Sequence, residues 1–149
     1  MKQILPLSAA VAMCAIISAA TSMSAQAAAQ RGACEVMPGA AAQAVLGAGM
    51  ETHEIALATT NGSTTTTCNY IGREHGATLM LYYQGSAAEA SASASNITAR
   101  LSGNGRTSRR GHGSGLAGSK GNVVVIVSVR ERGDAGKLKP LLAAAMSGL

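Results

Sequence analysis

The chain has 149 residues, of which 47% are hydrophobic but only 2% are aromatic, and it contains neither Phe nor Trp. The core must therefore be built from Val, Ile, Leu, Met and Ala, and the smaller of these bury little area each. The formal net charge is +5 at pH 7, and it falls to +4 without Lys2. This weak positive charge does not indicate a nucleic-acid-binding protein.

The N-terminus has the three parts of a secretory signal peptide. Lys2 supplies the positive charge, an apolar run follows it, and Ala25-Gln26-Ala27 has the A-x-A pattern of a cleavage site. The apolar run is shorter than the roughly 20 residues that a spanning helix needs, although an uncleaved anchor is the alternative. We expect residues 1–27 to be a signal peptide, 28–33 a flexible lead-in and 34–149 a single domain. The protein is then periplasmic or secreted, with no transmembrane segment after cleavage.

Export determines how the cysteines are interpreted. Cys14 lies in the signal peptide, so Cys34 and Cys68 are the thiols of the exported protein. An oxidising compartment is expected to pair them, which stabilises a loop of this size by about 3–4 kcal/mol. A metal or redox site is the alternative, but the sequence has no C-x-x-C motif and no His at ligand spacing. Neither Cys14 nor Cys34 follows the small-residue box of a lipoprotein, which favours a soluble protein.

The first half of the exported chain predicts a helix and then three strands. Pro38 is suited to the first turn of a helix over residues 39–46. The side chains expected near one face of this helix are Met37, Ala41, Ala44 and Val45. Alternating apolar residues predict strands at 51–60, with Ile55 and Leu57 on one side, and at 65–73 and 77–84. Asn61-Gly62 predicts a two-residue hairpin between the first two strands, and residues 74–76 predict a turn before the third.

The second half predicts a helix, two strands and a last helix. Ser86 and Glu89 form a capping box at the start of the first helix. Its apolar stripe is Ala87, Ala90, Ala94, Ile97 and Leu101. A Gly-rich loop at 103–113 leads to a short strand at 114–118, and a turn at 120–122 leads to a strand at 123–129. Val and Ile lie on both faces of this last strand, which is typical of a central strand.

The last helix is expected to place Leu138, Leu142, Ala145 and Leu149 on one face, and it accommodates Pro140 only in its first turns. The complete order predicts an α+β fold in two layers: an antiparallel sheet of about five strands, helices on one face and one disulfide.

Several motifs match known sites only in part. Residues 113–118 match G-x-G-x-x-G, but a basic loop precedes them and a strand follows, so a flexible turn is favoured over a dinucleotide or phosphate site. The three histidines, His53, His75 and His112, lack local ligand spacing and favour a scattered, solvated set over a metal site. Ser114 lies near His112 but lacks the flanking glycine of a nucleophile elbow. The acids show no recognisable acid/base pair.

The Gly-rich loop carries the candidate ligand site. The site consists of four basic residues: Arg106, Arg109, Arg110 and His112. Arg100 and Lys120 lie near them in the sequence. Arginines on such a loop can hold a phosphate, a carboxylate or an acidic partner. The alternative is an ordinary solvated loop.

The layout also resembles a group of small exported domains. Its features are Cys34, Pro38, a short helix ending at Leu46-Gly47, the run Cys68-Asn69-Tyr70, a Val-rich strand and a Leu-containing last helix. This layout resembles cysteine-paired bacterial exported domains and lipoproteins of unknown function, which are similar to the extracellular sensor domains of bacterial Ser/Thr kinases. The resemblance implies an α+β fold, a Cys34–Cys68 disulfide and no established enzymatic activity. The chain departs from it by lacking a lipobox, Phe and Trp.

These observations predict a non-catalytic envelope protein that acts as a binding, sensing or accessory module. The expected partner is an unknown envelope protein or an anionic ligand, and no cofactor, metal or nucleic acid is expected. A monomer is expected. The alternative is a small periplasmic hydrolase or hydrolase inhibitor.

Overall fold

The computed structural model describes residues 30–60, 63–103 and 114–149. The signal peptide expected at 1–27 lies outside the described residues, as does most of the Gly-rich loop, which carries the four candidate ligand residues. In the described part, no helix is long and apolar enough to cross a membrane.

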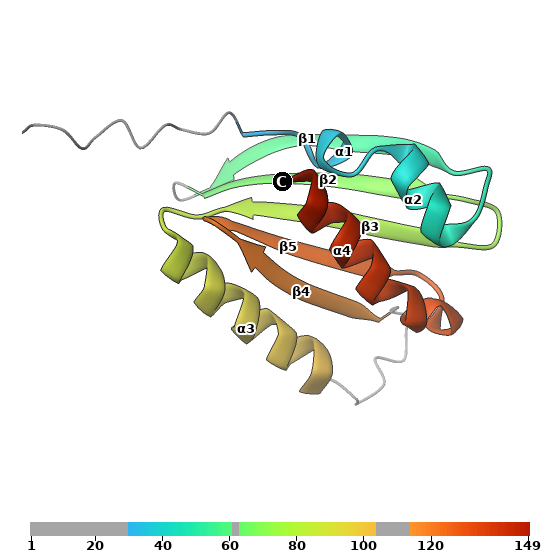
Figure 1. Ribbon diagram of the computed structural model, residues 1–149. Coiled ribbons are helices and arrows are strands. Elements are labelled where there is room, and N and C mark those ends of the chain that lie inside the picture. Colours follow the sequence, from blue (N-terminus) through green and yellow to red (C-terminus); the bar gives the residue numbers. More distant parts are fainter. Residues whose placement is uncertain (1–29, 61–62, 104–113) are drawn as a thin grey trace, which may run out of the picture.

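A five-stranded antiparallel sheet forms the centre of the domain, as predicted (Figure 1). The strands are β1 (Glu51–Thr60), β2 (Ser63–Ile71), β3 (Gly76–Tyr83), β4 (Gly115–Lys120) and β5 (Val123–Val129). Their order across the sheet is β1-β2-β3-β5-β4, so β5 is an interior strand. Thr60 pairs with Ser63, which leaves the two-residue connection expected between β1 and β2. Gly121, with a φ of 56°, allows the tight turn between β4 and β5.

Three helices cover one face of the sheet, which we call the inner face (Figure 1). They are α1 (Ala33–Val36), α2 (Gly39–Leu46) and α4 (Leu138–Gly148). The sheet contributes Leu79, Leu81 and the odd-numbered valines of β5 to this core. Pro140 lies in the first turn of α4, where its missing N–H is tolerated.

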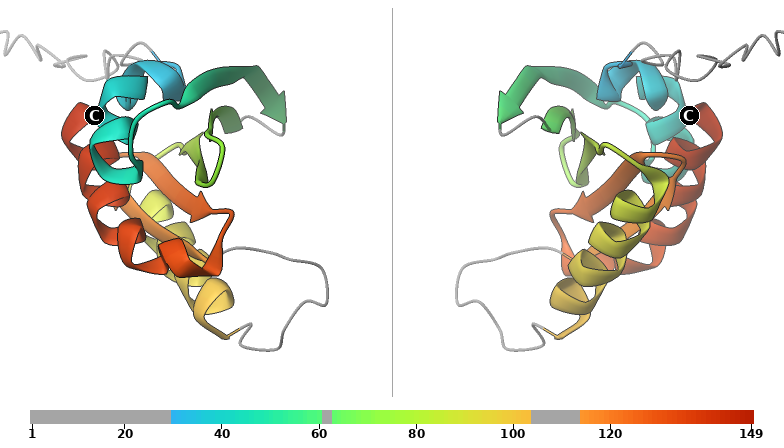
Figure 2. Two further views of the ribbon diagram at one scale, coloured as in Figure 1. Left: turned by 90° about the vertical axis from the view of Figure 1, so that its right-hand side faces the viewer. Right: turned by 90° about the vertical axis from the view of Figure 1, so that its left-hand side faces the viewer.

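The remaining long helix, α3 (Ala87–Gly103), packs against the opposite, outer face. Ala90 and Ala94 bury Val124, with Tyr82 and Ile126 beside them. Figure 2 shows α3 (yellow) and α4 (red) on different sides of the orange strands. The α+β fold and the antiparallel sheet are thus confirmed, but the expectation that all helices lie on one face is wrong. An interior strand that is apolar on both faces needs a cover on each.

The helices also differ from their predicted faces. In α2, the buried side chains are Ala42 and Leu46, whereas Ala44 is exposed. In α4, Leu141 is fully buried and Leu142 is only partly buried. In α4, Leu138 and Ala145 are buried as predicted, so only one position of its stripe differs. A short Ala-rich or Leu-rich helix offers more than one apolar stripe.

The Cys34–Cys68 disulfide, with a Cα–Cα distance of 5.1 Å, joins α1 to β2. Hydrogen bonds hold the same N-terminal segment. The Tyr70 hydroxyl donates to the carbonyl oxygen of Met37, at 2.5 Å, and the Tyr83 hydroxyl donates to that of Arg31, at 2.7 Å. This segment is therefore attached to the sheet by covalent and polar contacts as well as by small apolar side chains.

Removing the disulfide should destabilise the fold strongly. We expect the Cys34→Ala/Cys68→Ala variant to lose about 3–4 kcal/mol of unfolding free energy, because its unfolded chain is no longer cross-linked. Urea unfolding of the oxidised protein and the variant measures the difference. Coincident unfolding curves would contradict a stabilising role for the bond.

A second prediction concerns the close approach of α4 to α1. A Cβ atom added to Gly148 would collide with the carbonyl oxygen of Val36, whereas one added to Gly133 would have nothing within 4 Å. Gly148→Ala should therefore cost about 1–3 kcal/mol of unfolding free energy. Gly133→Ala serves as the matched control in the same urea titration, and equal stability of the two variants would show that the helices can separate freely.

Candidate functional site

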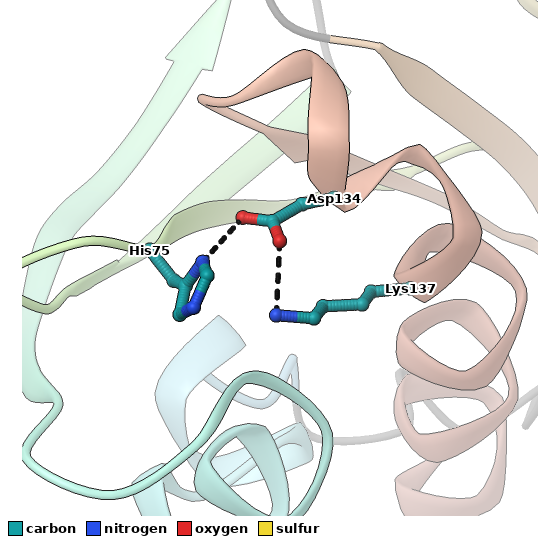
Figure 3. Close-up of polar contacts among 3 residues, drawn as sticks. All are labelled: His75, Asp134 and Lys137. Atoms are coloured by element: carbon teal, nitrogen blue, oxygen red, sulfur yellow. Dashed lines mark hydrogen bonds and ion pairs between the residues drawn. The ribbon is translucent and has the colours of Figure 1, made fainter.

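A buried carboxylate lies at one end of the sheet. Asp134, in the short 3-10 helix η1 (Arg132–Lys137), is 3% exposed. Its two oxygens have different partners (Figure 3): Lys137 Nζ is 2.9 Å from Oδ1, and His75 Nδ1 is 2.9 Å from Oδ2. His75 belongs to the turn between β2 and β3, so the carboxylate joins two segments that are distant in the sequence.

The partners of Asp134 keep it ionised. The hydrogen bond from Lys137, reinforced by that from His75, holds the pKa of Asp134 below its ordinary value, although burial acts in the opposite direction. Because an ionised carboxylate can only accept hydrogen bonds, His75 carries its proton on Nδ1. The cluster thus fixes both the charge of Asp134 and the tautomer of His75.

Exposed cations lie on the segments that carry this cluster and on those next to them. They are Lys139 in the first turn of α4, Arg132 in η1, Arg130 at the end of β5 and Arg73 in the β2–β3 turn. We call these four residues the basic end of the sheet. The backbone N–H of Arg130 donates to the carbonyl oxygen of Gly76, at 2.9 Å, which places the end of β5 beside the β2–β3 turn. Two exposed acids, Glu74 and Glu131, lie on the same segments.

The candidate ligand residues from the sequence are not described by the structure. Arg106, Arg109, Arg110 and His112 lie outside the described residues. The segment that contains them joins the described structure at Ser114, whose carbonyl oxygen accepts a hydrogen bond from the N–H of Val129, next to Arg130. Lys120 is at the other end of β4, where its Nζ donates to the carbonyl oxygen of Met146. The structure therefore separates Lys120 from the basic end.

The other motifs are resolved by the fold. Gly115 to Gly118 belong to strand β4, which agrees with rejecting a phosphate-binding loop. Exposed His53 lies 3.6 Å from Glu51, while His75 contacts Asp134. Among the described residues, no three His, Cys, Asp or Glu side chains form a group that could hold a metal ion.

The His75–Asp134–Lys137 cluster is the feature that sequence reasoning missed. The only local signal was the i, i+3 spacing of Asp134 and Lys137. His75 is 59 residues from Asp134, and only the sheet topology brings the two together.

An open groove runs between α3 and β4, and its polar lining is provided by Ser91, Ser95, Thr98 and Ser119. Thr98 Oγ1 donates to the carbonyl oxygen of Ala117, at 3.2 Å, which attaches the helix to the strand. The groove lining contains no charged side chain, so it offers no group for acid/base chemistry.

No protein-family model matches the chain, and the searches found no similar protein among curated sequences or solved structures.

Replacing the buried carboxylate should remove a pH-dependent part of the stability. Asp134→Asn should cost about 2 kcal/mol at neutral pH, because Lys137 and His75 lose their charged acceptor. The folded pKa of Asp134 is lowered, so its contribution is complete above the unfolded pKa of about 3.9 and disappears as the pH falls through the folded value.

Urea unfolding between neutral and strongly acidic pH tests this expectation. The stability difference between the native protein and Asp134→Asn should be constant above about pH 5 and shrink below about pH 4. Glu131→Gln, at an exposed acid next to η1, is the control and should leave the stability nearly unchanged. A difference that does not vary with pH would show that the charge of Asp134 is not the stabilising element.

Proposed function

We propose that the protein is an exported, non-catalytic binding module that attaches to an anionic partner of the envelope through the basic end of its sheet. One observation carries this proposal. Arg73, Arg130, Arg132 and Lys139 are exposed on adjacent segments, while the buried acid among them already has Lys137 and His75 as partners. The four exposed cations at this end thus outnumber the exposed acids, which are Glu74, Glu131 and Glu51, the residue that pairs with Ile71 at the start of β1.

Two further facts support the proposal. Ser114, which follows the Gly-rich loop in the sequence, hydrogen-bonds through its carbonyl oxygen to the N–H of Val129, next to Arg130. The Cys34–Cys68 pairing is compatible with an oxidising compartment, as the signal-peptide pattern at the N-terminus requires. Guanidinium groups bind phosphate and carboxylate through paired hydrogen bonds, which suits an anionic partner.

A hydrolase is the second candidate, and the His75–Asp134 pair is the observation in its favour. In hydrolytic triads a carboxylate orients the His that acts as the base. Within the described part of the chain, however, no hydroxyl or thiol hydrogen-bonds to His75, so the pair lacks a nucleophile to activate. The partners of Asp134 instead explain it as a link between η1 and the β2–β3 turn.

Binding to a soluble polyanion tests the proposed function. Poly-L-glutamate should bind the protein in a salt-dependent manner, and Arg130→Gln/Arg132→Gln should weaken the affinity by about tenfold, because two cations are removed from the contact. Fluorescence anisotropy of labelled poly-L-glutamate measures the affinity.

The matched control changes the net charge equally at another place. Ala88 and Ala92 are exposed near the start of α3, so Ala88→Glu/Ala92→Glu also lowers the charge by two. This variant should keep most of the affinity. Equal losses in both variants would show that only the overall charge matters, and the proposed site would be wrong.

A further inference from the structure

Exposed aliphatic side chains accompany the cations of the basic end. In the described part of the chain, the exposed large hydrophobic residues are Ile55 (56%), Ile71 (38%) and Leu101 (41%). Ile71 pairs with Gly76 at the β2–β3 turn. Leu101, in the last turn of α3, would contact a Cβ added to Gly115, at 3.2 Å, and it follows the exposed Arg100. Ile71 therefore lies at the end of β2, and Leu101 lies beside the start of β4.

The alternation of the strands places these groups on the outer face. Tyr70 and Val129 are buried on the inner face, so their neighbours Ile71 and Arg130 point outward. The Arg130 side chain lies across Gly76, with Nε and Cζ each 3.5 Å from the position of an added Cβ. The Arg130 guanidinium thus lies over β3, which is the neighbour of the strand that carries Ile71. Leu101 lies on the same face, at the end of α3.

α3 covers only part of the outer face, and Leu101 lies in its last turn. α3 buries Val124, with Tyr82, Ile97 and Ile126 beside it, so it lies over the β5 side of the sheet. Figure 1 shows β1 and β2 on the far side of the sheet from α3. Ile71 on β2 lies beyond this cover, and Arg130, just past the end of β5, is also exposed.

Aliphatic side chains among arginines have the chemistry of a membrane-surface contact. The aliphatic groups can enter the boundary between headgroups and acyl chains, and the guanidinium groups pair with lipid phosphates. The positive charge of the arginines contributes to membrane binding only where the lipids carry a net negative charge. A purely ionic partner would have no use for Ile71 and Leu101 beside these cations.

We propose that the anionic partner is a lipid bilayer, which the protein contacts through Ile71, Leu101 and Arg130 at the basic end of the sheet. The inference rests on the proposed function and narrows it to one kind of partner. Contact of this kind is peripheral and reversible, because it uses a few side chains and no spanning segment.

Cosedimentation with vesicles tests the inference. The disulfide-bonded protein should sediment with vesicles of equal parts phosphatidylglycerol and phosphatidylcholine, but not with phosphatidylcholine alone. Arg130→Gln/Arg132→Gln should lower the partition coefficient about tenfold. Ile71→Thr/Leu101→Ser should lower it several-fold in vesicles without changing the affinity for poly-L-glutamate.

The control for the aliphatic pair is Ile55→Thr, an exposed isoleucine of β1 further from the basic end, which should leave vesicle binding unchanged. Thermal unfolding of each variant shows that it is folded. Binding to poly-L-glutamate without binding to vesicles would overturn the lipid inference and leave the proposed function standing. Binding to neither probe would overturn both.

Discussion

The Cys34–Cys68 disulfide is the constraint on which the inner layer depends. The chain has no Phe or Trp, so α1 and α2 bury little apolar area of their own. The bond attaches α1 to β2, and the neighbouring tyrosine hydroxyls bind backbone carbonyls of the same segment. Burial raises the pKa of Tyr70, so its hydroxyl stays protonated and continues to donate. With α1 fixed, α4 can approach it closely, because Gly148 has no side chain at the Val36 carbonyl.

Local patterns predicted most of the fold, and long-range packing explains the rest. Alternating apolar residues located β1, β2 and β3, the run of Val and Ile located β5, and Asn61-Gly62 matched the two-residue connection of β1 and β2. The side of the sheet that α3 covers could not be read from its own stripe, because Ala90 and Ala94 fit either face. The residues that indicated a helix on the outer face were Val124 and Ile126 of β5, because apolar side chains on that face must also be buried. Leu141 and Leu142 of α4 both pack against the core, and the sequence could not show that Leu141 would be the more deeply buried of the two.

The sequence predicted the kind of ligand, an anion bound by arginines, but not the residues that form the candidate site. The sequence indicated an arginine-based anion site on the Gly-rich loop, and those residues lie outside the described part of the chain. The described cations come from other segments, and their gathering at one end follows from the sheet order, which places the β2–β3 turn beside the end of β5. The link between His75 and Asp134 has the same origin. Side chains from distant segments form both features, so neither leaves a motif in the sequence.

The central claim is that the disulfide holds one layer of the domain on a sheet that otherwise supports itself. Native-state hydrogen exchange of the oxidised protein and of Cys34→Ala/Cys68→Ala measures this directly, amide by amide. We expect β3, β5 and α3 of the variant to lose only as much protection as its global stability falls, whereas α1, α2 and the neighbouring part of β2 lose more, because they open below the free energy of global unfolding. A loss of protection in α1 and α2 no larger than that in β3 and β5 would contradict it.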